Sequence, residues 1–438
     1  MRSKMMAAVA VAAVGALALA ACSGGGSTAG GSAGAGTSAA PITLTYWAWG
    51  TAQEPMVAAW NKSHPDIQVK HTDAGGANDS AAKLLTATRA GNAPDASLVE
   101  YQTLPAMIVG NVAADITKYV SAAAKGSFTN ADWGLATFNG AIYGVPQDVG
   151  PMAFVYNKAR LAALGVPVPT TWAEFATAAK KVHTEDPKAY LTTFDPAQFG
   201  GFAGLAQQAG AKWWSVNGKT WTVDIDGPQS IAVANYWQGL LDNGAIKAEP
   251  LLTPQWNQEL NNGKILSWPS ALWAPGVIYG VAPKMAGQWA MAPLPQWTPG
   301  DAEVGNQGGS AVVVTTSSKH PKQAAEFAAW INSSQEGADV QLSTGQYPAS
   351  KLGEAAAEKS APPLLMPQQT DFWPLASKIA AKTIPSISWG PDVNVASSAF
   401  QDAMAKAIAN GTPLSAALIQ VQKVVVADMK KTGFTVTN

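Results

Sequence analysis

The chain has 438 residues and a nearly balanced charge, with 28 Lys and Arg against 29 Asp and Glu. Only 13% of residues are charged, so the chain lacks the basic footprint of a nucleic-acid-binding protein. One Cys excludes an internal disulfide framework, and four His leave little for a metal site, so we expect no metal and no cofactor. The 17 Trp, more numerous than the 9 Tyr or 11 Phe, are the feature that a function must explain.

The N-terminus reads as an export signal. Arg2 and Lys4 precede an uncharged stretch over 5–21, which ends in Leu-Ala-Ala before Cys22. This ending resembles the lipobox of bacterial lipoproteins, in which the Cys becomes the acylated first residue. We therefore expect a signal peptide over 1–21 and a lipid-anchored protein at the extracytoplasmic face of the cell membrane. An ordinary signal peptide with an incidental Cys is the alternative.

A tether and a folded body follow the signal. The lipidated Cys and the Gly/Ser/Ala-rich run make up 22–40, whose composition is typical of a flexible linker with a reach of roughly 20–25 Å. No segment after the signal is apolar enough to predict a membrane span.

Strands and helices are predicted to alternate in the first part of the body. Strands are expected at 41–47, 66–70 and 95–99, with a helix carrying Met56, Val57 and Trp60 and another over 81–90. This order predicts an α/β fold with a largely parallel sheet. Ligands of such sheets bind beyond the carboxyl ends of the strands, where Trp47, Trp49, Glu100 and Tyr101 fall.

Further signals continue along the chain. Thr171 and Glu174 form a capping-box pattern that opens a helix ending near His183, and Asn217-Gly218 predicts a hairpin turn. A buried strand is expected at 310–316. Further helices are expected over 229–243, from Pro321, and over 394–409 and 413–431.

Several stretches together resemble one family. Tyr143 to Gly150 followed by Phe154-Val155-Tyr156-Asn157-Lys158, and Ala163 to Phe175 with its Thr-Trp pair, are similar to segments of the extracellular solute-binding proteins, family 1. This is the maltose-binding-protein-like group of ATP-driven sugar importers. Further similar pieces occur in the same order: Asn262-Gly263-Lys264 with the Trp-bearing stretch after it, Gly308-Gly309-Ser310, and Gly345 to Ala349. The resemblance covers essentially 41–438.

The resemblance implies a type II periplasmic-binding-protein-like fold, with two α/β lobes joined by hinge segments around a ligand cleft. By that analogy lobe one comprises 41–149 plus 304–350, and lobe two comprises 150–303 plus 351–438. It also implies closure of the lobes over the solute and recognition of the closed form by a membrane permease.

The Trp excess fits such a cleft, because aromatic rings stack on the C–H faces of sugars while carboxylates and amides bond the hydroxyls. The candidate ligand-binding residues are Trp47, Trp49, Glu100, Tyr101, Gln147, Asp148, Trp268, Trp273, Gly308, Gly309, Ser310, Tyr347 and Trp389. The strand alternation leaves open whether Trp47 or Trp49 faces the core instead. Trp60, Trp172, Trp237 and Trp330 lie on helical patterns and are expected in the core.

The predicted function is capture of a neutral saccharide, with a di- or oligosaccharide favoured by the number of aromatics, by a monomeric binding protein that serves an ABC permease. Binding of a polyol, polyamine or phosphodiester by the same architecture is one alternative. A secreted glycoside hydrolase is another, but it needs two placed carboxylates. Glu54, Glu100 and Asp148 supply candidates without a motif that brings them together, so we expect no catalysis.

Overall fold

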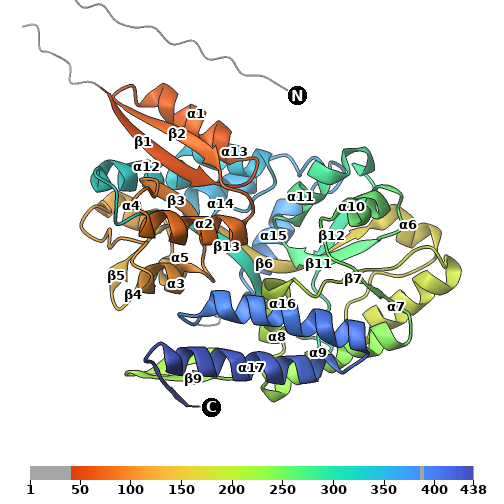
Figure 1. Ribbon diagram of the computed structural model, residues 1–438. Helices are drawn as coiled ribbons and strands as arrows, with labels where there is room; N and C mark the ends of the chain where they lie inside the picture. Colours follow the sequence, from red (N-terminus) through yellow and green to blue (C-terminus); the bar gives the residue numbers. More distant parts are fainter. Residues whose placement is uncertain (1–40, 385–388, 438) are drawn as a thin grey trace, which may run out of the picture. The chain divides into compact units, whose positions relative to one another are not determined.

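The computed structural model describes residues 41–384 and 389–437 (Figure 1). The signal peptide, Cys22 and the tether predicted within 1–40 lie outside the described residues.

A seven-stranded mixed sheet crosses the described part of the chain, in the order β2, β1, β3, β13, β6, β11, with β12 also paired to β6. Its strands are β1 (Ile42–Ala48), β2 (Ile67–Asp73), β3 (Ala96–Glu100), β6 (Val145–Asn157), β11 (Ser267–Ala271), β12 (Trp289–Pro293) and β13 (Asn306–Val314). Only the β1–β2 and β1–β3 pairs are parallel, and the other pairs are antiparallel. The expectation of a largely parallel sheet is therefore wrong beyond the first three strands. The antiparallel pairs arise because β13, from a distant part of the sequence, lies between β3 and β6 and runs opposite to both, while β11 and β12 run opposite to β6.

Helices and strands elsewhere follow the local signals closely. Thr171 caps α7 (Trp172–Glu185), because its hydroxyl accepts from the Glu174 amide and the Glu174 carboxylate accepts from the Thr171 amide. Asn217-Gly218 joins β8 (Trp214–Asn217) to β9 (Thr220–Val223), with Gly218 at φ +61°. Both sequence predictions are confirmed.

The remaining predicted helices are also present within a few residues of their expected ends. They are α1 (Gln53–Ser63), α2 (Ala77–Arg89), α9 (Pro228–Asp242), α12 (Pro321–Ser333), α16 (Val393–Asn410) and α17 (Leu414–Lys431). Elements without a sequence prediction are α3 (Leu104–Val109), α4 (Ala122–Gly126), α5 (Asn130–Ala136), β4 (Thr137–Phe138), β5 (Ala141–Ile142), α6 (Lys158–Ala163), β7 (Thr193–Phe194), α8 (Phe199–Gln208), β10 (Lys247–Ala248), α10 (Pro254–Asn261), α11 (Ala274–Val281), η1 (Pro283–Met285), α13 (Gln335–Ser343), α14 (Lys351–Ala357), α15 (Phe372–Ala380) and β14 (Thr435–Thr437).

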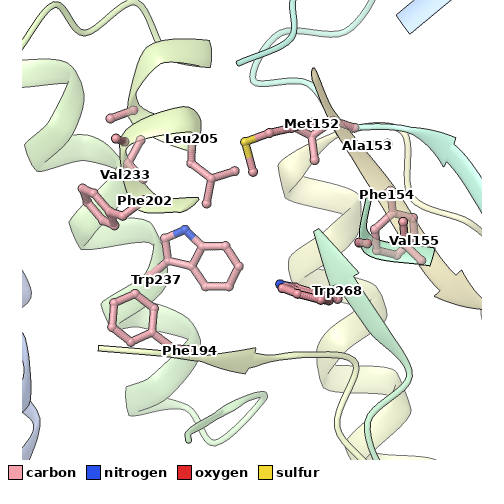
Figure 2. Close-up of a cluster of buried hydrophobic side chains, with 14 of the residues drawn as sticks. Met152, Ala153, Phe154, Val155, Phe194, Phe202, Leu205, Val233, Trp237 and Trp268 are labelled. Carbon is pink, nitrogen blue, oxygen red and sulfur yellow. The ribbon is translucent and has the colours of Figure 1, made fainter. Parts of the chain in front are cut away.

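Buried side chains form two cores, which we call the first and the second core. The first core packs on both faces of β1, β3 and β13, with α1 and α12 on one face and α2 and α3 on the other. The second core gathers around the second half of β6 and includes α7, α8, α9, α16 and α17. Figure 2 shows part of it, where Trp237 and Trp268 lie among Phe194, Phe202 and Met152.

The described chain passes repeatedly between the cores. Within β6, Val145 belongs to the first core and Met152 to the second. The chain returns through β13 and then leaves again between Ala349 and Ala357. These crossings place the ends of several elements from both cores next to one another, and the candidate site lies there.

Candidate ligand cleft

A cavity of about 1050 Å³ lies beside the crossing strands, and its walls come from both cores. Val149 and Pro151 of β6 and Asn306 of β13 line it where the chain crosses. The first-core side is formed by Tyr101, by Pro105 of α3 and by residues of the segment from Thr129 to Asn139. The other walls come from the β8–β9 hairpin, α14, α15 and Trp389. A space of this size exceeds the usual range of small-molecule pockets and suits an extended ligand.

Five aromatic side chains among the described residues contribute to the cavity wall. Of the thirteen candidate contacts, Tyr101, Tyr347 and Trp389 border the cavity. Phe138 and Trp221 border it too, although neither was among the predicted ligand contacts. Trp221 lies on β9, where it is held by the hairpin and by the parallel strand β14, which is more than 200 residues away in the sequence. The Asn-Gly signal could have led to Trp221, because a hairpin presents its side chains in a fixed alternation.

Carboxylates line the same cavity. Asp132 of α5 caps its own helix, since its Oδ2 accepts from the Thr129 amide at 2.9 Å and from the Thr129 hydroxyl. Glu354 of α14 is half-buried, and burial together with the charge of Asp132 raises its pKa to about 7. Glu358 and Lys351 lie at the exposed margin. Sequence reasoning missed all four, because nothing local marks α14 as part of a cleft.

Glu100, Trp273 and Gly308 form a second group of candidates, at the C-terminal end of β3. Glu100 and Tyr101 are adjacent and point to opposite faces, so Gly308 contacts the Glu100 side and Gly309 the Tyr101 ring. A Cβ placed on Gly308 would lie 3.4 Å from Glu100 Oε1 and 3.6 Å from Trp273 Nε1. The φ of +70° at Gly308 and this proximity explain the glycine there.

Glu100 is held by a polar neighbour. Gln102 Nε2 donates to its Oε2 at 2.5 Å, while Gln102 Oε1 is buried without a hydrogen-bond partner among the described residues. Burial raises the pKa of Glu100 to about 7, and the nearby charge of Asp148 adds to the rise. Trp273 Nε1 donates to the carbonyl of Gln307 at 3.1 Å. The structure therefore brings Glu100, Trp273 and Gly308 together, but away from the large cavity.

The candidates on the crossing strands, which are Gln147, Asp148 and Ser310, are held by hydrogen bonds within the protein. Ser310 donates to Asp148 Oδ1 at 2.5 Å between the paired strands β13 and β6. Burial raises the pKa of Asp148 to about 6, although the bonds from Ser310 work against that rise. Gln147 is fully buried and bonded at both ends of its amide, to Gln53 at 2.8 Å and to Asn332 at 3.0 Å.

The other candidate tryptophans pack into the cores. Trp47 is half-buried against the α2 side of the first core, and Trp49 against the α1 side. Trp268 is 5% exposed and meets Trp256 and Trp273 edge to face. None of the three borders the large cavity, although Trp268 borders a void of about 60 Å³ inside the second core.

Within residues 41–384 and 389–437, no group of three or more His, Cys, Asp or Glu is placed to hold a metal ion. Over the same ranges, no helix combines the length and the apolar character needed to cross a bilayer.

Two cores joined by crossing strands beside a cleft define the type II periplasmic-binding-protein fold, and solved structures share it. A binding protein associated with the ABC transporter of B. animalis subsp. lactis Bl-04, solved with β-1,6-galactobiose, is 25% identical with a TM-score of 0.82. The galacto-N-biose/lacto-N-biose I-binding protein of Bifidobacterium longum, solved with lacto-N-biose, is 28% identical with a TM-score of 0.81. Each alignment covers 91% of this chain and all of the other.

The sequence profile described as bacterial extracellular solute-binding protein matches residues 50–338. The chain belongs to this family, as the sequence resemblance predicted. An arabinooligosaccharide-binding protein of Halalkalibacterium halodurans is 27% identical over 295 residues, which are 65% of this chain and 64% of that protein. The match therefore spans a little under two thirds of this relative. Family and fold are those of transport binding proteins.

Proposed function

We propose that this protein captures a di- or oligosaccharide in the large cavity and delivers it to the membrane permease of an ABC importer. The observation that carries the proposal is the aromatic-walled cavity of about 1050 Å³ between the two cores. Flat aromatic faces with a few carboxylates and amides match the alternating C–H and hydroxyl surfaces of sugars. The relatives named above bind arabinooligosaccharides, β-1,6-galactobiose and lacto-N-biose, which supports the same solute class here.

We assign the lobes along the predicted boundaries, with lobe one at 41–149 plus 304–350 and lobe two at 150–303 plus 351–438. The passages between the cores within β6 and β13 support this division. In this assignment Tyr101 and Phe138 contact the solute from lobe one, and Trp221 and Trp389 contact it from lobe two. Closure then brings the two sets of rings onto one ligand.

The other candidates divide into two roles in this proposal. Glu100, Trp273, Gly308, Gly309, Asp148 and Ser310 hold the crossing segments, and they are available to ligand when the lobes separate. Gln147 positions β6. The protein acts by binding alone, and the cleft carboxylates serve as hydrogen-bond acceptors, in keeping with a fold and family of transport proteins.

The binding proposal predicts the effect of removing the Trp221 ring. In titrations of the purified protein with arabinooligosaccharides, galactobiose and related sugars, we expect a bound sugar to raise the melting temperature. A ligand at 100 times Kd contributes about 2.7 kcal/mol. Trp221→Ala should weaken that binding at least tenfold, because a stacked face is lost.

The matched control is Trp330→Ala, which removes a half-buried ring from α12, away from the cavity. It should change the melting temperature and leave Kd unchanged. No response to any sugar in the panel would refute the saccharide proposal. Equal Kd values for Trp221→Ala and the wild type would refute the assigned cavity.

The cellular location is proposed from Cys22, which lies outside the described residues. Acylation of Cys22 would anchor the protein at the extracytoplasmic face of the membrane, with the tether at 23–40 letting the body reach its permease. Cys22→Ala is expected to release the protein from the membrane fraction into the medium, as followed by immunoblotting of both fractions. Retention of the variant in the membrane fraction would contradict the anchor.

A further inference from the structure

Three carboxylates share the space of the large cavity. Asp132 comes from α5, and Glu354 and Glu358 come from α14 and its end. The pKa of the Tyr347 hydroxyl is affected by all three carboxylates. Burial raises its pKa to about 12, a hydrogen bond with Ser377 opposes the rise, and the fields of Glu354, Glu358 and Asp132 add to it. The three negative charges therefore act on one region of the cavity wall.

Among the described lining residues, one cation stands against these three carboxylates and offsets only part of their charge. Lys351 is the lysine of the lining, and its ammonium group donates to the carbonyl of Gly126 at 3.0 Å. The ion pairs among the described residues are Arg160 with Asp186 and Lys247 with Glu249 and Glu259, and none of these residues borders the cavity. One oxygen of Asp132 is used in capping α5. Its other oxygen and the Glu354 carboxylate make no hydrogen bond or ion pair identified in the described part.

A buried hydroxyl provides a second, independent observation. Tyr101 borders the cavity and is 3% exposed, and its hydroxyl lies beside the backbone of Gln147 without reaching full hydrogen-bonding geometry with any described residue. A buried polar atom without a partner costs free energy, so such an atom in a cavity wall is a sign of a missing ligand group.

Resting on the proposed saccharide function, we propose that the captured saccharide carries a protonated amino group, which Glu354 binds with help from Asp132 and Glu358. The Tyr101 hydroxyl oxygen accepts a hydrogen bond from the sugar. The faces of Trp221 and Trp389 attract the cation through their ring quadrupoles. This ligand differs from the neutral sugar that the low charge of the whole chain predicts.

The physical reason is the cost of enclosing charge. A neutral sugar can donate hydroxyls to the carboxylates, but lobe closure would then leave net negative charge inside a space of low dielectric constant. Burial already raises the pKa of Glu354 to about 7, ahead of the effect of Asp132. An ammonium group neutralises the site and makes charge-assisted hydrogen bonds with it.

Two matched sugar series test the proposal by calorimetry and thermal shift at pH 7. The first is the β-1,4-linked glucosamine disaccharide, its N-acetylated form and cellobiose. The second is galactosamine, N-acetylgalactosamine and galactose, and spermidine serves as an amine without a sugar. In at least one series we expect the amine form to bind at least tenfold more tightly than both of its counterparts. Glu354→Gln should remove that preference. Glu326→Gln, at an exposed position of α12, should keep it.

Any other outcome contradicts the inference. The sugar series also distinguish a failure of the amine claim from a failure of the proposed saccharide function. If the N-acetylated or neutral sugars bind as tightly as the amines, the amine claim falls and saccharide capture stands. If only spermidine binds, or if nothing in the panel binds, both claims fall. If Glu354→Gln keeps the preference, the site assignment is wrong.

The folding of Glu354→Gln can be checked independently. The folded state raises the pKa of Glu354 from about 4.5 to about 7, so it binds the proton more tightly than the unfolded chain does. The contribution of this group to stability therefore falls as the pH rises between these values. Asp132 and Lys351 are the charged groups that act on it. The variant should melt at a higher temperature than the wild type at pH 8, and the difference should vanish near pH 4.

Discussion

Replacing Gly305 by alanine is expected to lower the free energy of unfolding by about 3 kcal/mol or more, at the upper end of the cost of overpacking. A Cβ at this position would lie 1.9 Å from the carbonyl oxygen of Gly204 on α8. Both partners are backbone, so no flexible side chain can move aside. The measurement is the urea unfolding midpoint at constant slope.

The reason for this contact is the way α8 lies on the crossing segment. Gly204 is the partner of Gly305 in this contact. A Cβ added at Gly204 would lie 2.5 Å from Met152 Sδ and 2.8 Å from the Asn306 carbonyl oxygen. Gly204→Ala should therefore also destabilise the protein. Since the contact joins the second core to the segment that leads into β13, both variants should also alter ligand affinity in the titrations described above.

The control for the Gly305 prediction is Gly239→Ala. Gly239 is exposed on α9 with no atom near its added Cβ, so alanine should stabilise the helix by about 0.5–1 kcal/mol. Equal urea midpoints for Gly305→Ala and Gly239→Ala would contradict the close backbone contact between α8 and Gly305.

Gln147→Leu is expected to lower the free energy of unfolding by about 2–4 kcal/mol, because it leaves two buried polar partners unpaired. The Tyr46 hydroxyl donates to Gln53 Oε1 at 2.7 Å, and Gln53 Nε2 donates to Gln147 Oε1. Gln147 Nε2 then donates to Asn332 Oδ1, and Asn332 Nδ2 donates to the carbonyl of Val145. This chain ties β1, α1, β6 and α12 together where β6 leaves the first core.

A double-mutant cycle tests whether the network acts as a unit. Gln53→Leu combined with Gln147→Leu should cost less than the sum of the two single changes, because the second substitution removes a group that the first has left unpaired. Gln335→Leu is the control, since Gln335 is exposed on α13 and bonds only Asp339 across one helical turn. It should change stability by less than about 0.5 kcal/mol. Additive costs in the cycle would mean that the hydrogen bonds are independent of one another.

Local elements were predictable because their signals act over a few residues. The capping box at Thr171, the Asn-Gly turn and the period of the C-terminal helices each satisfy local hydrogen bonds or one apolar face, and the structure confirms them. The parallel sheet was predicted correctly only through β3. Beyond β3, strand direction depends on which distant segment pairs with β6, and no local pattern in Val145–Asn157 encodes that partner.

The candidate site was predictable only in part. The aromatic excess and the family resemblance led to Tyr101, Tyr347 and Trp389, which border the cavity. Whether they touch a ligand stays a prediction. Trp60, Trp172 and Trp237 are buried as their helical patterns predict, and Trp330 is half-buried beside them.

The sequence by itself determined the family, the helices and strands that carry strong local signals, and a chain rich in aromatic side chains with few charges. The export and lipidation signal at 1–22 also stays a prediction from the sequence, because such signals are read as linear segments. Only the tertiary structure decided which rings and carboxylates share one space. Trp221, Glu354 and Asp132 are each unremarkable within their own hairpin or helix. They meet because the described chain crosses repeatedly between its two cores, and the order of those crossings depends on long-range packing.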